Sequence, residues 1–195
     1  MKIAIRAVKE EDYQRVAELI YSTEPYPQVI WGRGSKDNII KRLKDLITKD
    51  DSRYSSRFIY VAEAFNYIVG LVIFIPVEEL KLLDKATDDY LINNLHRDFK
   101  KRFEKHLKSS KKGRGPKGRE IYISNLVMDE GYKNLTIGKK LVETVEEQGY
   151  LLGYDKICLT TNDIKAMEFY KALNFVIEEE EFFDHMTSFR MVKYL

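Results

Sequence analysis

Residues 126–138 read Leu-Val-Met-Asp-Glu-Gly-Tyr-Lys-Asn-Leu-Thr-Ile-Gly, and the fold class depends on this stretch. Three aliphatic residues are followed by a polar loop and then by the first residues of an amphipathic segment. This is the order of a strand, a loop and a helix start. Because the first backbone amides of a helix have no partner within the helix, they can bind an anion. The stretch therefore predicts an anion site between a strand and a helix.

The flanking segments extend this pattern. Residues 121–128 and 156–160 are both strand-like. Between them, residues 138–148 are helix-like, with Leu141 and Val145 facing inward. A strand, a helix and a second strand in this order predict that the two strands pair in parallel through a right-handed crossover.

A second informative segment follows the later of these strands. Asn162 or Asp163 can cap a helix that runs to Leu173. Residues 175–183 and 186–194 then predict a final hairpin.

Together the two segments resemble the GNAT superfamily of acyl-CoA dependent N-acyltransferases. The first is similar to the family's pyrophosphate loop, and the residues that match are Tyr132, Ile137 and Gly138. The residues that depart from the family pattern are Lys133, Leu135 and Thr136. The second segment is similar to the family's Asn-x-x-Ala-x-x-Phe-Tyr-x-x-Leu-Gly-Phe pattern, with one extra residue after the Asn. Its matching residues are Asn162, Ala166, Phe169, Tyr170, Leu173 and Phe175.

A looser resemblance covers the amino-terminal half, at Ile5-Arg6 with Asp12 and at residues 60–63 and 68–70. It implies an α/β fold with a mixed α+β sheet, of the GNAT-like acyl-CoA N-acyltransferase type. The chain has 195 residues, of which 44% are hydrophobic, and this is the size of one domain. We therefore expect residues 1–195 to form a single GNAT domain.

Hydrophobic periodicity predicts the elements of this half. A short strand at residues 3–5 leads into an amphipathic helix at residues 13–20, and Ser35 can cap a second helix. Residues 58–62 and 68–75 are rich in β-branched and aromatic side chains, which predicts an antiparallel hairpin.

Residues 77–119 lie outside the resemblance and are expected to form a helical insertion between the third and fourth strands. Residues 78–107 carry apolar side chains at helical spacing, which predicts one or two amphipathic helices. These can serve as a lid, a dimer contact or a cover over the sheet edge. Residues 108–119 hold six basic residues, three glycines, a proline and no acid, which predicts a mobile loop. That loop is solvated, or it contacts an acidic partner or a cofactor phosphate.

The resemblance implies acetyl-CoA as the cosubstrate. In the family the fourth and fifth strands splay apart around the pantetheine arm, and the loop binds the pyrophosphate. The residues expected at the cofactor are Leu126, Val127, Met128, Lys133, Asn134, Leu135, Thr136, Ile137, Gly138, Lys139, Asn162 and Tyr170. Tyr170 occupies the family's general-acid position, where it would protonate the departing thiolate. The backbone N–H of Met128 or a neighbour would stabilise the oxyanion.

The resemblance also implies a primary amine as acceptor, either a small molecule or a peptide, attacked in a ternary complex. Many relatives place an acid in the fourth strand, whereas this chain has Ser124 and Asn125 there. The base is then a water held by these two residues, or a carboxylate such as Glu63 or Glu120. The residues expected near the acceptor are Ser124, Asn125, Tyr26 and Trp31.

Each functional interpretation has a structural alternative. Gly138 can be a close-packed helix start, Tyr170 a core aromatic and Asn162 a helix cap. Thr136 and the missing acid favour a second hypothesis, an acyl-CoA binding or sensor module with impaired catalysis.

Composition and residue spacing limit the possible partners, the location and the metal content of the protein. The formal charge of +2 makes nucleic acid an improbable partner, and no apolar run is long enough for a leader or a membrane span. The single cysteine, Cys158, lies in an apolar run, which indicates a structural role in a cytoplasmic protein. Its spacing to His96, His106 and His185 does not predict a metal site. A homodimer remains an open expectation.

Overall fold

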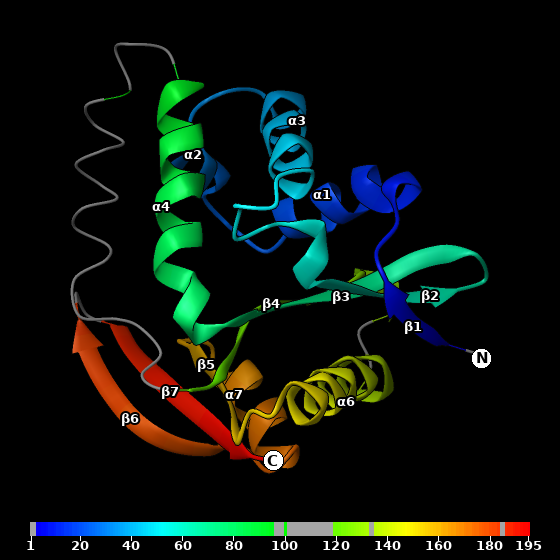
Figure 1. Ribbon diagram of the computed structural model, residues 1–195, viewed down its shortest axis with the longest axis vertical. Coiled ribbons are helices and arrows are strands. Elements are labelled where there is room, and N and C mark those ends of the chain that lie inside the picture. Colours follow the sequence, from blue (N-terminus) through cyan, green and yellow to red (C-terminus); the bar gives the residue numbers. More distant parts are fainter. Residues whose placement is uncertain (1–2, 96–99, 101–118, 133–134, 184–185) are drawn as a thin grey trace.

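A computed structural model describes residues 3–95, 100, 119–132, 135–183 and 186–195. Seven strands form one mixed sheet in the order β1-β2-β3-β4-β5-β7-β6 (Figure 1). The strands are β1 (Ala4–Ala7), β2 (Ile59–Ala64), β3 (Tyr67–Pro76), β4 (Ile121–Met128), β5 (Lys156–Thr161), β6 (Val176–Phe183) and β7 (Met186–Tyr194). The α/β class and the mixed sheet are therefore confirmed.

The junction between β4 and β5 differs from every other strand pair. It is parallel, as predicted, whereas the other neighbours are antiparallel. Pairing is limited to Ile121 opposite Ile157 and Tyr122 opposite Cys158. β5 instead pairs along its whole length with β7, as far as Thr161 opposite Phe189. The two parallel strands therefore diverge after Tyr122.

Helices cover both faces of the sheet (Figure 1). Those in the described residues are α1 (Tyr13–Tyr21), α2 (Pro27–Trp31), α3 (Lys36–Ile47), α4 (Val77–Asn93), α6 (Leu135–Leu152) and α7 (Ile164–Ala172). Short 3₁₀ turns are η1 (Glu10–Asp12), η2 (Ser56–Phe58) and η3 (Glu130–Tyr132). Helices α1 to α4 lie on one face and share a core with alternate side chains of β2 and β3. Helices α6 and α7 pack on the opposite face around a second core.

The predicted strands and both predicted hairpins are present. The residues that form one hairpin turn and cap two of the helices can be identified. Ser35 Oγ accepts a hydrogen bond of 3.3 Å from the Asn38 amide, which confirms it as the cap of α3. Phe65 and Asn66 adopt positive φ angles in the turn between β2 and β3. The cap of α7 is Asp163, whose carboxylate accepts from the Lys165 amide at 2.9 Å. The capping role suggested for Asn162 therefore belongs to Asp163.

Helix boundaries differ more from the predictions. Helix α6 begins at Leu135, three residues before Gly138, and the short helix α2 was not predicted. Between β3 and β4, the structure places α4 at the start of the predicted helical segment of residues 78–107. The rest of that segment from residue 101, and the basic loop as far as residue 118, lie outside the described residues. Among the described helices, none combines the length and the apolar character needed to cross a membrane.

A buried ion network lies at the end of the sheet where β4 and β5 are paired. The guanidinium of Arg190 donates to Glu120 and to Glu178, both at 2.7 Å. Only 8% of the Arg190 side chain and 4% of the Glu120 side chain are exposed. Burial raises the pKa of the adjacent Cys158 thiol to about 12, and Glu120 adds to this effect. The thiol therefore stays protonated at neutral pH, in agreement with a structural role.

Candidate functional site

The divergence of β4 from β5 leaves one edge of β4 open. Beyond Tyr122, no described strand pairs with the edge of β4 that faces away from β3. Residues 124–128 on this open segment are partly exposed. Leu126 and Met128 pack with the core under α6, whereas Val127 packs with the core under α1 to α4. Between these two cores, the unpaired backbone groups of β4 face the space between the diverging strands. We call this space the opening.

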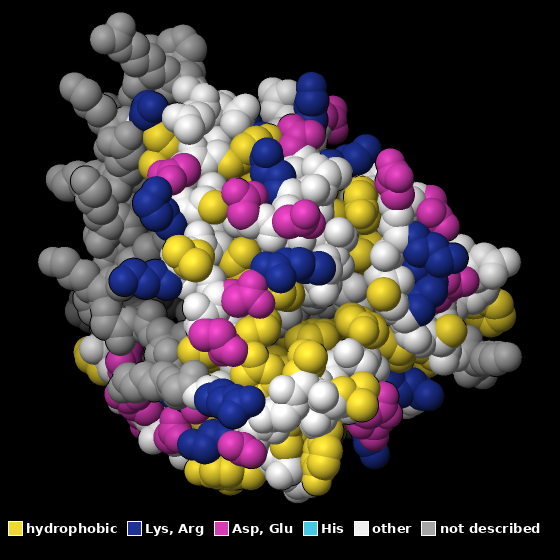
Figure 2. Space-filling model, in the orientation of Figure 1, with side chains coloured by type: hydrophobic (Ala, Val, Ile, Leu, Met, Phe, Trp, Pro, Cys, Tyr) yellow, Lys and Arg dark blue, Asp and Glu magenta, His cyan; other side chains and the backbone are white. Residues whose placement is uncertain are grey.

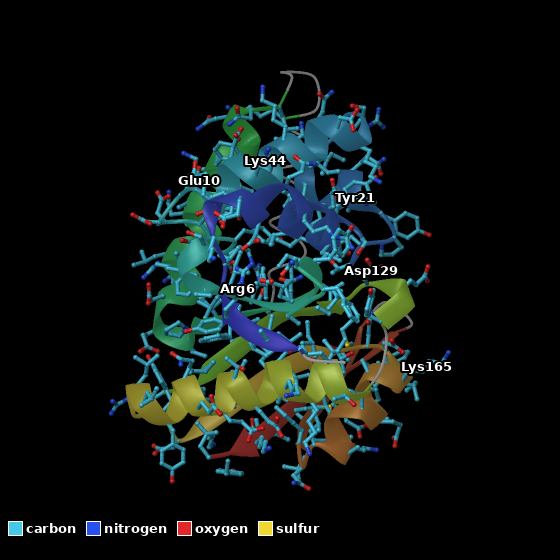
Figure 3. All side chains as sticks on the ribbon, turned by 90° about the vertical axis from the view of Figure 1, so that its right-hand side faces the viewer. Arg6, Glu10, Tyr21, Lys44, Asp129 and Lys165 are labelled. Carbon is cyan, nitrogen blue, oxygen red and sulfur yellow. The ribbon has the colours of Figure 1, made fainter. Side chains whose placement is uncertain are left out.

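The loop after β4 is tied to the sheet and to α1. The Asp129 amide donates to the Val69 carbonyl at 2.8 Å, and the Tyr132 amide donates to the Asp129 carbonyl at 2.8 Å. The Asp129 carboxylate is ion-paired with Arg15, which also donates to the Ile68 carbonyl at 3.2 Å. Figure 3 shows Asp129 on the same side of the molecule as Lys165, near the starts of α6 and α7. At Gly138 the first turn of α6 comes close to Met128 of β4 and to Phe169 of α7, so these three elements meet here.

The start of α6 carries the residues predicted to bind the pyrophosphate. Lys133 and Asn134 lie outside the described residues, as does the side chain of Leu135. Thr136 and Lys139 are exposed, and Lys139 is within 3.7 Å of Glu143 on the next turn. The dipole of a helix is positive at its start, which favours a negatively charged ligand at this end of α6. The described part of this segment can therefore bind an anion through its backbone.

Gly138 is buried in the first turn of α6, where it permits a close approach to α7. A Cβ at this position would lie 2.8 Å from Phe169 Cζ and 3.2 Å from Met128 Sδ. Real side chains do not approach so closely, so a larger residue would force these groups apart. The glycine thus has a packing function whether or not its amide also faces a ligand.

Replacing Gly138 with Val is expected to weaken acetyl-CoA binding about tenfold, because α6 must move away from α7 and β4. Overpacking of this kind costs about 1–3 kcal/mol of folding stability. Isothermal titration calorimetry measures the affinity, and thermal unfolding gives the stability. The matched control is Gly131→Ala in η3, just before α6, where an added Cβ meets no atom within 4 Å. Wild-type affinity in folded Gly138→Val protein would show that this turn does not bind the cofactor.

Tyr170 lies on α7, buried in an aromatic cluster with 7% of its surface exposed. Its ring makes edge contacts with Phe169 and Phe175, at centroid distances of 5.1 and 5.3 Å. Burial raises its pKa above the usual value, and the nearby Tyr122 phenol contributes to the increase. Tyr122 is the last residue of β4 paired with β5. The phenol of Tyr170 is therefore a protonated group close to the point where the strands diverge.

The residues predicted near the acceptor are not all at a surface. Tyr26 is exposed, whereas Trp31 is 1% exposed and belongs to the core under α1 to α4. The Trp31 indole donates to the Tyr54 hydroxyl at 3.0 Å and stacks on Tyr21. Trp31 is thus a core residue, and only Tyr26 of this pair has an exposed ring. Asn162 is exposed after the end of β5.

Ser124 and Asn125 lie on the open segment of β4. Near them are two side chains from other segments, Arg53 and Glu24, which the sequence analysis did not predict at this site. Ser124 Oγ donates to Asn125 Oδ1 at 3.0 Å and accepts from Arg53 Nη2 at 3.0 Å. Burial raises the pKa of Glu24, and the positive charge of Arg53 opposes that increase. Arg53 is far from β4 in sequence, so no local pattern could have revealed it. Glu24 stands in the loop before Tyr26 and could have been considered there.

The two carboxylates suggested as bases occupy other parts of the sheet. Glu63 is on β2 and accepts from Arg6 of β1 at 2.7 Å. Glu120 accepts from Arg190 at the paired end of β4. Both are held in ion pairs away from the open segment, so the geometry favours neither as the base. On the described chain, no group of three His, Cys, Asp or Glu side chains could hold a metal, and the three histidines lie outside it.

Charge on the visible face also bears on possible partners. Figure 2 shows Lys and Arg interspersed with Asp and Glu over the described part of this face, without an extended patch of one sign. Nucleic-acid binding surfaces are usually basic over a continuous area. This face therefore does not have the charge pattern of a nucleic-acid interface.

Comparison with known proteins gives one family and many similar folds. The Acetyltransferase (GNAT) family profile matches residues 16–175. An N-acetyltransferase from Staphylococcus aureus Mu50 has 20% identity and a TM-score of 0.74, with 97% of this chain and 100% of that chain covered. The PaiA N-acetyltransferase from Thermoplasma acidophilum, solved in complex with coenzyme A, has 16% identity and a TM-score of 0.58 over 100% of both chains.

A polyamine N-acetyltransferase from Drosophila melanogaster has 13% identity and a TM-score of 0.60, also over 100% of both chains. No curated protein matches the sequence. At these identities the structural likeness concerns the fold alone.

Proposed function

Because the chain belongs to the Acetyltransferase (GNAT) family and is an acyltransferase, we propose that it transfers an acetyl group from acetyl-CoA to a primary amine. The observation that carries this proposal is the divergence of β4 from β5 after Tyr122. It leaves an open strand edge between a helix start and a buried phenol. An extended thioester arm can pair with such an edge, as an added strand would.

The described residues fit acetyl-CoA at this opening. The backbone of Leu126, Val127 and Met128 is available to the amide groups of the pantetheine arm. The first turn of α6, at Thr136 to Lys139, would hold the pyrophosphate through its amides and its positive dipole. Arg15 would keep the intervening loop in place through Asp129. One relative of the same fold was solved with coenzyme A, which supports this choice of cosubstrate.

The reaction we propose is a direct attack in a ternary complex. The neutral amine nitrogen forms a bond to the thioester carbonyl carbon, and the C–S bond then breaks. A backbone N–H near Met128 stabilises the negative oxygen of the intermediate. The sulfur leaves as a thiolate and takes the proton of Tyr170, whose raised pKa keeps that proton in place until then. The nitrogen is cationic after the attack, so it loses a proton to become the neutral amide, and the phenolate of Tyr170 takes up a proton to return to its starting form.

The amine must lose a proton before it attacks. An alkylammonium group with a pKa of about 10.4 is mostly protonated at neutral pH. We propose that a water held by Ser124 and Asn125 takes this proton, because these two side chains lie on the open segment of β4. The acceptor can be a small amine or a peptide amino group. A polyamine enzyme among the similar folds makes a small di- or polyamine a reasonable first probe.

Adding acetyl-CoA is expected to raise the unfolding temperature. Ligand at 100 times its dissociation constant adds about 2.7 kcal/mol to the free energy of unfolding. For a domain of this size that corresponds to a shift of about 5–10 °C. The measurement is a thermal-shift titration with acetyl-CoA and, in parallel, with adenosine 3′,5′-bisphosphate. A saturable shift supports the cofactor site, and no shift with either ligand would contradict it.

A second assay separates a transferase from a binding module. Release of free CoA is followed with Ellman's reagent while single amines are added to the protein and acetyl-CoA. Amine-dependent release, together with the acetylated amine in a mass spectrum, supports the proposed reaction. Saturable binding without release by any amine would instead support the sensor hypothesis, which is motivated by the departure from the family pattern at Thr136 and by the missing acid in β4.

A further inference from the structure

Arg53 connects three parts of the chain beside the open segment of β4. It lies in the loop between α3 and η2. Its backbone amide donates to Thr87 Oγ1 of α4 at 3.0 Å, and its Nη1 is 3.0 Å from the Asp84 carboxylate. Thr87 and Asp84 are three residues apart, so they lie on the same face of α4. Both the backbone and the side chain of Arg53 are therefore attached to this helix.

The other end of the Arg53 side chain reaches the irregular part of β4. Its Nη2 donates to Ser124 Oγ. Ile73 lies opposite Asn125 and Phe74 lies opposite Ile123, so Ser124 has no opposite residue on β3. A strand is least constrained by its ladder at such a bulge. The hydrogen bond from Arg53 therefore restrains the position where β3 does not.

The surroundings of Arg53 make it hard to replace. Its guanidinium interacts electrostatically with Asp84 and Asp88 of α4, and with Glu24 of the loop after α1. The Tyr54 and Tyr122 phenols also lie close to it. Its buried Nε has no hydrogen-bond partner among the described residues. Without this cation, the carboxylates would repel one another and Ser124 would lose its donor.

We propose that Arg53 is a positioning residue for the acceptor side of the opening. It fixes the bulge at Ser124 against α4, and through Ser124 it sets the position of Asn125. The amine, or the water that takes its proton, then meets the thioester in a defined place. This inference rests on the proposed acetyl transfer, and it adds α4 to the elements that shape the site. The anion site at the start of α6 is held separately, through Arg15 and Asp129.

The test compares kinetics and cofactor affinity in one set of variants. Arg53→Gln is expected to lower kcat/KM for the amine about tenfold, the low end of what the loss of a charged hydrogen bond costs. The dissociation constant of acetyl-CoA should change less than about twofold, because distant sites contribute independently. Arg53→Lys keeps the charge and should recover part of the loss. Ser124→Ala, a smaller change, should lower kcat/KM alone and add little to Arg53→Gln.

A matched control is available four residues later, in η2. Arg57 is also ion-paired with α4, through Glu79, but it lies at the surface away from Ser124. Arg57→Gln should leave kcat/KM unchanged. Unchanged kcat/KM in folded Arg53→Gln, or an equal loss in Arg57→Gln, would overturn the inference. If Arg53→Gln does not fold, unchanged kcat/KM in both Arg53→Lys and Ser124→Ala would also overturn it. Wild-type protein that acetylates no amine would instead refute the proposed function.

Discussion

Replacing Tyr170 with Phe is expected to lower kcat about 1000-fold, within the range by which a general acid accelerates proton transfer. The change removes one hydroxyl and keeps the ring that contacts Phe169 and Phe175. Affinity for acetyl-CoA should therefore stay close to that of the wild type. Steady-state CoA release gives kcat, and calorimetry gives the dissociation constant.

Two further measurements make the Tyr170 result specific. Tyr150→Phe alters an exposed tyrosine of α6 and should leave kcat unchanged. Raising the pH should not restore the activity of Tyr170→Phe, because the variant has no group to ionise at that position. A kcat equal to that of the wild type would assign Tyr170 to the core alone.

The largest loss of stability is expected for Arg190→Met. The substitution leaves Glu120 buried with its principal partner removed, and the remaining cation, Lys156, is 3.9 Å away. Removing one member of a buried ion pair costs about 3–5 kcal/mol. For a chain of this length the midpoint of thermal unfolding should fall by about 10 °C. Chemical denaturation followed by circular dichroism measures the change in free energy.

The double variant Arg190→Met with Glu120→Gln tests the cause. It removes the uncompensated charge, so it should be more stable than Arg190→Met alone. Lys85→Gln breaks the exposed pair with Asp89 and should have no measurable effect. If Arg190→Met were as stable as the wild type, the ion network would not contribute to stability.

Most of the fold could be predicted because its signals are local. The strand-like run of residues 121–128 marked β4, and polar caps marked α3 and α7. The parallel pairing of β4 with β5 followed from the helix between them. Helix α2 was missed because it has five residues, too few to show periodicity. The start of α6 was placed late because Leu135 and Thr136 read as loop residues.

The same difference between local and long-range signals applies to the candidate site. The loop and the Tyr170 segment could be recognised because each is contiguous, and their binding and catalytic roles remain predictions. Arg53 reaches Ser124 across 71 residues, and Glu24 approaches Arg53 from a third segment. A pattern within a short stretch of sequence cannot indicate contacts between residues that lie so far apart along the chain. Trp31 looked like a pocket wall because an aromatic in a loop can face either a ligand or the core, and only its burial distinguishes the two.

The position of β7 in the sheet determines when the opening can form during synthesis of the chain. One wall of the opening, β5, has its continuous strand partner in β7, and β7 comes last along the chain. The Leu195 amide also donates to the Asp155 carbonyl, next to the first residue of β5. A nascent chain that ends before residue 186 has the helix start and the tyrosine, but β5 has only two paired positions on β4. We therefore expect the candidate opening to form only once β7 has been synthesised and has paired with β5, and a chain that lacks β7 not to bind acetyl-CoA.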